Sequence, residues 1–132
     1  MDLNKYIGIK YSDYNCWELV TLFYRNELNV ELPKYYEKRS EDRDKLSEII
    51  YDKKSEYVEV PFKDLRKYDL LLFYVKGVAS HIGVYLGRGK FLHTREDIDT
   101  VIEALDNWKT KLAGIYRYEH KISEESSIKH RS

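Results

Sequence analysis

The sequence has 132 residues, and 23 Lys and Arg balance 23 Asp and Glu, so the formal net charge is zero. This length supports one compact domain, and the absence of a basic excess argues against nucleic acid or an anionic membrane as a partner. The single cysteine excludes an intramolecular disulfide and a cysteine-based zinc site. No signal peptide and no apolar stretch of membrane-spanning length is readable. We therefore expect synthesis in the cytoplasm and no membrane insertion.

The first half of the chain has helical patterns. Apolar residues recur at helical spacing over residues 15–28, which predicts a central amphipathic helix. Asn15 is a good N-cap, and Glu18 three residues later resembles a capping box. Pro33 is expected to stop any continuation. Residues 37–54 carry a narrow apolar stripe among many charges, which is typical of a surface helix.

From residue 57 onward the pattern changes to short strands. The strand candidates are residues 57–60, 70–75, 81–86, 90–93, 101–104 and 114–118. Gly87, Arg88 and Gly89 form a glycine-rich hairpin loop of three residues. Helices followed by closely spaced strands predict an α+β fold with an antiparallel sheet. We expect residues 1–118 to form the domain and residues 119–132 a polar, flexible tail.

Cys16 is the first candidate for chemistry. If Asn15 is the N-cap, Cys16 is the first helical residue, and free backbone N–H groups lie beside its sulfur. These groups and the positive end of the helix favour the reactive thiolate over the thiol. The alternative is a small buried hydrophobic residue without a chemical role.

His81 and His93 are the second and third candidates. With a three-residue loop at 87–89, His93 lies opposite Gly83, and His81 is its diagonal neighbour on the same face of the sheet. A two-residue loop would place the two rings on opposite faces. One cysteine at a helix start and two histidines on one face suit a thiol nucleophile, a base and a residue that orients the base. A metal site built from the same three residues is the competing use, but no carboxylate stands at ligand spacing.

These residues lie in stretches that resemble the NlpC-type cell-wall cysteine peptidases. The matching stretches are NCWELV around Cys16, YDLLLF at 68–73, SHIGVYLGRGKFLHT at 80–94 and LDNWKTKLAGIYRY at 105–118. The tryptophan segment and the strand after it are most similar to the phage tail-assembly members. The family pattern has Asp before the cysteine and Gly two residues after it, where this chain has Asn15 and Glu18. A carboxylate one turn from the sulfur would disfavour the thiolate.

The resemblance implies a papain-like α+β fold in which an N-terminal nucleophile helix packs on an antiparallel sheet. It implies Cys16 as nucleophile, His81 as general base and His93 as the residue that orients His81. Tyr11 matches a family tyrosine near the nucleophile that helps bind the substrate carbonyl, and the Cys16 N–H is expected to serve as an oxyanion donor. No cofactor and no metal are implied.

The implied activity is hydrolysis of peptidoglycan stem peptides, with the bond between D-glutamate and a diamino acid as the expected target. The implied partners are these stem peptides and phage tail proteins, and the implied location is a virion tail or the cell wall. Two alternatives stay open. One is a catalytically silent tail-assembly module with the same fold, which Glu18 favours. The other is a thiol amidase or acyltransferase, although Cys16 precedes both histidines, unlike in the permuted lipid acyltransferases.

Overall fold

The computed structural model of the chain describes residues 2–32 and 57–119 and contains short helical elements and a six-stranded sheet; three of the helical elements precede the sheet and two lie between its strands. The helical elements are η1 (Leu3–Lys5), α1 (Cys16–Phe23), η2 (Tyr24–Leu28), η3 (Phe62–Asp64) and η4 (Leu105–Lys111). The strands are β1 (Tyr57–Glu59), β2 (Leu70–Val75), β3 (Val78–Gly87), β4 (Lys90–Arg95), β5 (Asp99–Ala104) and β6 (Leu112–Tyr118). This composition confirms the predicted α+β class. The predicted helix at 37–54 and the tail from residue 120 lie outside the described residues.

The helix begins where its capping residues predict. Asn15 has an extended backbone, its side chain accepts a hydrogen bond from the Glu18 N–H, and the Glu18 carboxylate accepts one from the Asn15 N–H. This reciprocal pair is a capping box. The helical path continues through the π-turn η2 and ends at Asn29, whose backbone is left-handed with φ 57°. The predicted range of 15–28 is therefore confirmed, and the stop comes from Asn29 rather than from Pro33.

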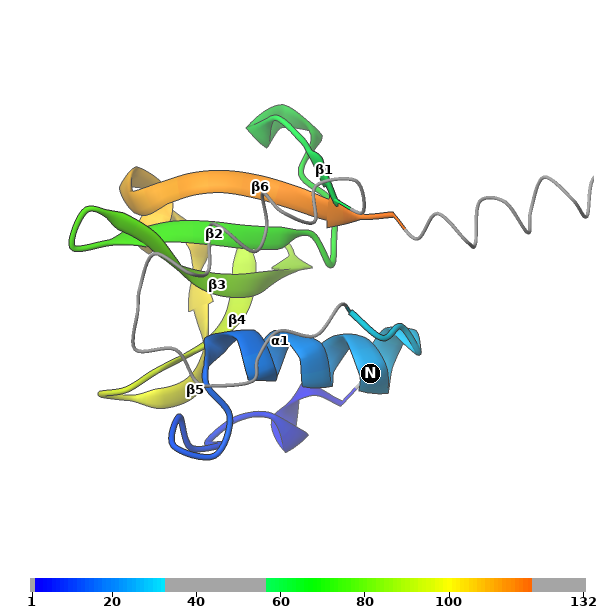
Figure 1. Cartoon of the computed structure of the whole chain (residues 1–132), viewed down its shortest axis with the longest axis vertical. Coiled ribbons are helices and arrows are strands. Elements are labelled where there is room, and N and C mark those ends of the chain that lie inside the picture. Colours follow the sequence, from blue (N-terminus) through cyan, green and yellow to red (C-terminus); the bar gives the residue numbers. More distant parts are fainter. Residues whose placement is uncertain (1, 33–56, 120–132) are drawn as a thin grey trace, which may run out of the picture.

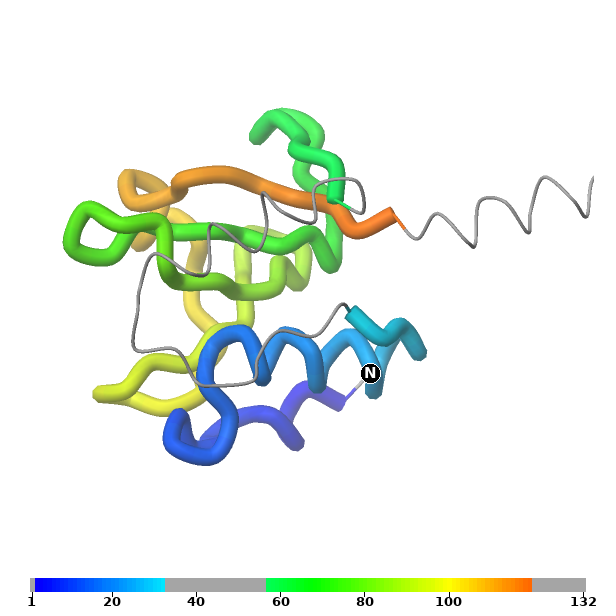
Figure 2. The backbone as a smooth tube through the Cα atoms, viewed as in Figure 1, coloured from blue at the N-terminus to red at the C-terminus, as the bar shows by residue number. Residues whose placement is uncertain are grey.

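The six strands form one antiparallel sheet in the order β1-β6-β2-β3-β4-β5. The sheet curls, so that β4 and β5 turn towards the side on which α1 lies (Figure 1). The N-terminal segment runs beside β5, because the Gly8 N–H donates to the Thr100 carbonyl and the Thr100 N–H donates to the Ile9 carbonyl. Figure 2 shows this blue segment next to α1 at the yellow end of the sheet. Within residues 2–32 and 57–119, no helix combines the length and apolar character needed to cross a membrane.

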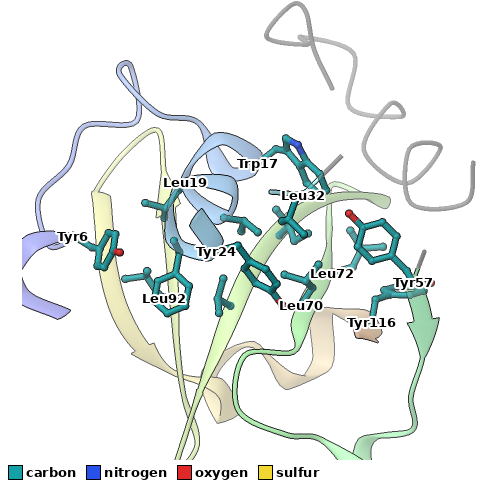
Figure 3. Packing of buried hydrophobic residues seen from close by; sticks show 14 residues of the cluster. Tyr6, Trp17, Leu19, Tyr24, Leu32, Tyr57, Leu70, Leu72, Leu92 and Tyr116 are labelled. Carbon is teal, nitrogen blue, oxygen red and sulfur yellow. The ribbon is translucent and has the colours of Figure 1, made fainter. Parts of the chain in front are cut away.

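The sheet separates two apolar clusters because successive side chains of a strand point to opposite faces. On one face, α1 buries Trp17, Leu19, Val20 and Phe23 against Leu70, Leu72, Ile82, Val84 and Leu92 (Figure 3). The opposite face carries Leu71, Phe73, Phe91 and Ile115, which Leu105 and Trp108 of η4 cover. The chain therefore has a large core under the helix and a smaller one under η4.

The β3–β4 hairpin differs from its prediction in one detail. Arg88 and Gly89, with φ 56° and 77°, form a two-residue turn, and Gly87 pairs with Lys90. The predicted three-residue loop at 87–89 is therefore wrong. A two-residue turn in which both residues have positive φ matches the right-handed twist of the two strands. An irregularity between Tyr85 and Gly87 places one extra residue on β3, so the predicted register is kept at Tyr85↔Phe91 and Val84↔Leu92.

Candidate active site

Cys16 is the first residue of α1 and is half-buried. Burial raises the pKa of its thiol, and hydrogen bonds from the backbone N–H groups of Ile82, Trp17 and Cys16 itself oppose that rise. The nearby Glu18 carboxylate adds to the rise. The sequence predicted that the helix start would favour the thiolate. The structure shows the opposite net direction, because burial of the sulfur outweighs the N–H groups that face it.

The Ile82 N–H faces Cys16 because two strands separate at this point. Pairing of β3 with β4 ends at Val84↔Leu92, although β3 runs back to Val78 and β4 runs on to Arg95. The Tyr85 N–H donates to the Asp69 carbonyl next to β2, so by alternation the Ile82 N–H points to the β4 side. Helix α1 contacts both strands there. The Cys16 sulfur, which interacts with the Ile82 N–H, therefore lies close to the point where β3 and β4 separate.

His81 and His93 are in direct contact. The His81 Nε2 and His93 Nδ1 atoms lie 2.8 Å apart, and the two rings meet nearly edge to face with centroids 5.1 Å apart. The predicted shared face is confirmed. Gly83 makes the close approach possible, since a Cβ there would lie 2.9 Å from the Leu92 carbonyl oxygen and 3.2 Å from the His93 Cβ.

Glu103 completes the chain of hydrogen bonds, and the sequence analysis did not identify it. Its Oε1 lies 2.6 Å from the His93 Nε2. A carboxylate can only accept, so the His93 Nε2 carries the proton and its Nδ1 accepts from the His81 Nε2–H. The His81 Nδ1 is then left without a proton. The signal in the sequence was an acidic residue within the otherwise apolar strand candidate 101–104.

Aromatic rings surround both histidines. His81 packs against Phe73 and Trp108, with ring centroids 5.9 Å and 5.6 Å away, and His93 packs against Phe91 at 4.4 Å. Burial, reinforced by His93 and Arg95, lowers the pKa of His81 from 6.5 to about 3. Burial also lowers the pKa of His93, although the Glu103 carboxylate opposes this. At neutral pH the site therefore holds a neutral imidazole at His81 and a protonated thiol at Cys16.

Trp108 and two cations cover this site from η4 and β4. The Arg95 guanidinium lies 5.2 Å from the Trp108 ring centre, and the Lys111 ammonium lies 5.1 Å from it. Arg95 also donates a hydrogen bond of 2.9 Å to the Asp97 carboxylate. The indole thus packs against both histidines, tilted to the His81 ring and nearly perpendicular to the His93 ring, and it has two cations beside it.

Tyr11 is half-buried and lies in a turn five residues before Cys16. Its backbone N–H donates a hydrogen bond of 3.0 Å to the Asp99 carboxylate at the start of β5. Asp99 adopts a positive φ of 63° at this position. The role expected for the Tyr11 hydroxyl stays a prediction. Among residues 2–32 and 57–119, no group of three or more His, Cys, Asp and Glu side chains has the arrangement of a metal site.

Cys16 lies beside Ile82 of β3, and His81 and His93 form a hydrogen-bonded pair on β3 and β4. The catalytic roles that the resemblance implied for these three residues stay predictions. Residues 4–117 match the NlpC/P60 family. The chain belongs to the NlpC/P60 family. A comparison with curated proteins gives no match.

Solved structures similar to this NlpC/P60 chain support the fold. An NlpC/P60 family protein from Bacillus cereus ATCC 10987 has 23% identity and a TM-score of 0.57, over 80% of this chain and 32% of that one. A lipoprotein-like protein of the same family from Staphylococcus aureus subsp. aureus Mu50 has 21% identity and a TM-score of 0.55, over 81% and 32%. The NlpC/p60 domain of the peptidoglycan hydrolase SagA has 14% identity and a TM-score of 0.61, over 86% and 91%. The chain thus spans about a third of the first two proteins and nearly all of the third domain, which confirms the papain-like fold.

Proposed function

We propose that this NlpC/P60 chain is a cysteine peptidase that hydrolyses an amide bond in peptidoglycan stem peptides. One observation carries the proposal. Three backbone N–H groups point at the Cys16 sulfur, one of them from Ile82, which directly follows His81. His81 is in turn held by the hydrogen-bonded series His93–Glu103. A nucleophile, a base and a residue that holds the base are the groups needed for acyl transfer through a thiol.

The first step is proton transfer from Cys16 to His81. The His81 Nδ1 carries no proton, so it accepts the thiol proton as the sulfur attacks the amide carbonyl. Because the thiol and the imidazole are both neutral at rest, charge separation accompanies the attack rather than preceding it. The new S–C bond forms while the carbonyl π pair moves to oxygen, and the Cys16 N–H at the helix start is the donor we expect to bind that oxygen.

The second step releases the amine and then the acid. The protonated His81 gives its proton to the leaving nitrogen as the C–N bond breaks, which leaves a thioester on Cys16. A water molecule then loses a proton to the His81 Nδ1 and attacks the thioester. The acid leaves and the thiol is restored, so His81 ends each cycle neutral.

The finer assignments extend this proposal. The resemblance favours the bond between D-glutamate and the diamino acid as the target, with Tyr11 assisting at the substrate carbonyl. The same resemblance favours phage tail proteins as partners and a virion tail or the cell wall as the location. The solved domain of SagA, described as a peptidoglycan hydrolase, supports cell-wall peptide as the substrate class.

The test is mass spectrometry of defined stem-peptide fragments incubated with wild type and with Cys16→Ala. We expect two new fragments whose masses add up to the substrate plus one water, with the cleaved bond given by the fragment masses. Cys16→Ala should give none, and Cys16→Ser serves as a matched variant of nearly the same shape. Intact substrate with folded wild-type protein would favour the catalytically silent module. Transfer of the acyl group to an added amine instead of water would favour the acyltransferase alternative.

A further inference from the structure

We propose that Glu103 is a positioning residue that fixes the tautomer of His81 through His93, so that the catalytic unit has four members rather than three. The proposal rests on the proposed function, because it assigns a role within the same site. Its basis is the chain of contacts from the His81 Nε2 to the His93 Nδ1 at 2.8 Å and from the His93 Nε2 to the Glu103 Oε1 at 2.6 Å.

The β4–β5 register explains why Glu103 reaches His93. Val101 is the direct partner of His93 on β5, and Glu103 is the direct partner of Phe91. His93 and Glu103 are therefore diagonal neighbours on one face of the antiparallel pair, a separation that a long side chain can bridge. His93 is fully buried, while the Glu103 side chain is 27% exposed. The carboxylate is thus the point at which the buried series of hydrogen bonds meets the surface.

The Glu103 carboxylate determines which ring nitrogen of His93 and of His81 carries the proton. Neutral imidazole has one donor and one acceptor nitrogen, and either nitrogen can carry the proton. Glu103 has only acceptor sites when ionised, so it selects the Nε2–H form of His93. His93 then presents an acceptor Nδ1, which selects the Nε2–H form of His81. Without Glu103, the two rings could reverse together, and the His81 Nδ1 would then carry a proton and could not act as a base.

The charge of Glu103 has a second effect. Proton transfer from Cys16 makes His81 cationic, and Arg95 on β4 opposes that charge from the same side of the sheet. Asp97 partly offsets Arg95, since its carboxylate accepts a hydrogen bond of 2.9 Å from the guanidinium. Glu103 is the carboxylate that reaches the pair directly, through His93. It therefore stabilises the cationic His81 that forms during the reaction.

The first experiment measures tautomers and needs no substrate. We would record the ¹⁵N chemical shifts of the His81 and His93 ring nitrogens at pH 7 in wild type, Glu103→Leu and Glu103→Ala. In wild type, His81 should show a protonated Nε2 and an unprotonated Nδ1. In both variants we expect a mixture of the two neutral tautomers. Glu96→Gln is the matched control, because it removes one negative charge from the exposed turn of the same hairpin and should leave the shifts unchanged.

The second experiment measures kinetics. Glu103→Leu should lower kcat by about 10- to 100-fold, the range seen when groups that orient a functional histidine are removed, with little change in KM. Glu103→Gln retains an acceptor oxygen and should recover part of that loss. In a His93→Ala background, which removes the connection between Glu103 and His81, Glu103→Leu should add little further loss, because Glu103 acts through His93.

The outcomes separate the two proposals. If folded Glu103→Leu or Glu103→Ala keeps a single wild-type tautomer at His81, the positioning role is wrong, whatever the activity. If the tautomers mix as expected but wild type cleaves no stem peptide, the proposed function fails and the role of Glu103 stands. Full additivity of Glu103→Leu and His93→Ala in kcat would also overturn the proposal, since it would show that Glu103 acts independently of His93.

Discussion

At the scale of single residues, the site rests in a neutral state. Burial raises the pKa of the Cys16 thiol and lowers the pKa of His81 to about 3, so neither group is charged at neutral pH. The Ile82, Trp17 and Cys16 N–H groups favour the thiolate, but they do not outweigh the loss of water around the sulfur. Activation therefore depends on proton transfer to His81 in the presence of substrate.

The neutral resting state predicts the titration of Cys16. The rate of alkylation by iodoacetamide as a function of pH should give an apparent pKa above the value of about 8.5 for a free thiol. Glu18→Gln should lower that pKa, because it removes the negative charge while the amide oxygen still accepts from the Asn15 N–H. A midpoint below 7 in wild type that rises in His81→Asn would instead show a thiolate–imidazolium pair at rest.

Substitutions of His93 distinguish a role in orienting His81 from a role as the general base. Gln or Asn at this position can accept from the His81 Nε2–H and donate to Glu103, so His93→Gln and His93→Asn should keep appreciable activity. His93→Ala should lose more, between a modest factor and about 10⁴ in kcat, and His81→Asn should be nearly inactive. Steady-state rates with circular dichroism as the folding control decide this. Equal inactivity of folded His93→Gln and His81→Asn would show that the roles are wrongly assigned.

At the scale of elements, the separation of β3 from β4 makes the site. Pairing of the two strands ends at Val84 and Leu92, and α1 contacts both strands. The close approach at Gly83 lies between the paired region and the histidines, so it sets how the two rings meet. A change in the approach of β3 to β4 should therefore alter both the place where Cys16 lies and the contact between the two histidines.

Gly83→Ala tests this dependence. The added Cβ would lie 2.9 Å from the Leu92 carbonyl oxygen, which belongs to a paired backbone and cannot move freely. We expect a loss of about 1–3 kcal/mol in the free energy of unfolding, measured by urea denaturation, and weaker activity. Gly114→Ala is the comparison, because the atoms nearest to its Cβ belong to the Tyr116 side chain, at 3.0–3.3 Å, and not to a paired backbone. Equal stability of the two variants would contradict the tight approach of β3 and β4.

At the scale of the whole molecule, two cores on either side of one sheet hold the site in place. Helix α1 packs on one face and η4 on the other, and the histidines lie on the η4 side against Phe73, Phe91 and Trp108. A partly buried ion pair between Asp69 and Arg117 joins the residue before β2 to β6, with an N–O distance of 2.8 Å. The histidines are therefore part of the apolar packing as well as of the site.

This burial predicts sensitivity to acid. The unfolded chain binds a proton at His81 near pH 6.5, whereas the folded protein binds it only near pH 3, so the unfolded state is favoured as the pH falls through that window. His81 alone should remove about 1.4 kcal/mol of unfolding free energy per pH unit there, and His93 adds in the same direction. Urea denaturation at pH 7, 6, 5 and 4 measures this. His81→Asn should show a shallower decline, and parallel curves for the two proteins would contradict the low pKa.

The sequence by itself determined the local structure and most of the candidate site. The capping box gave the helix start at Cys16, and glycines and alternation gave the strands and the register that brings His81 to His93. These features depend on residues close in the chain, where spacing and backbone chemistry suffice. The hairpin turn was predicted one residue too long, because a two-residue turn with a strand irregularity has the same register as a three-residue loop.

Only the tertiary structure decided the rest. Glu103 joins the site through the pairing of β5 with β4, and Ile82 faces Cys16 because α1 meets the separated strands. The helix start predicted a lowered pKa for Cys16, but the direction depends on how much water the packed sheet and helix remove from the sulfur. Desolvation depends on all the surrounding elements together, so no local pattern in the sequence could show whether the pKa of Cys16 rises or falls on folding.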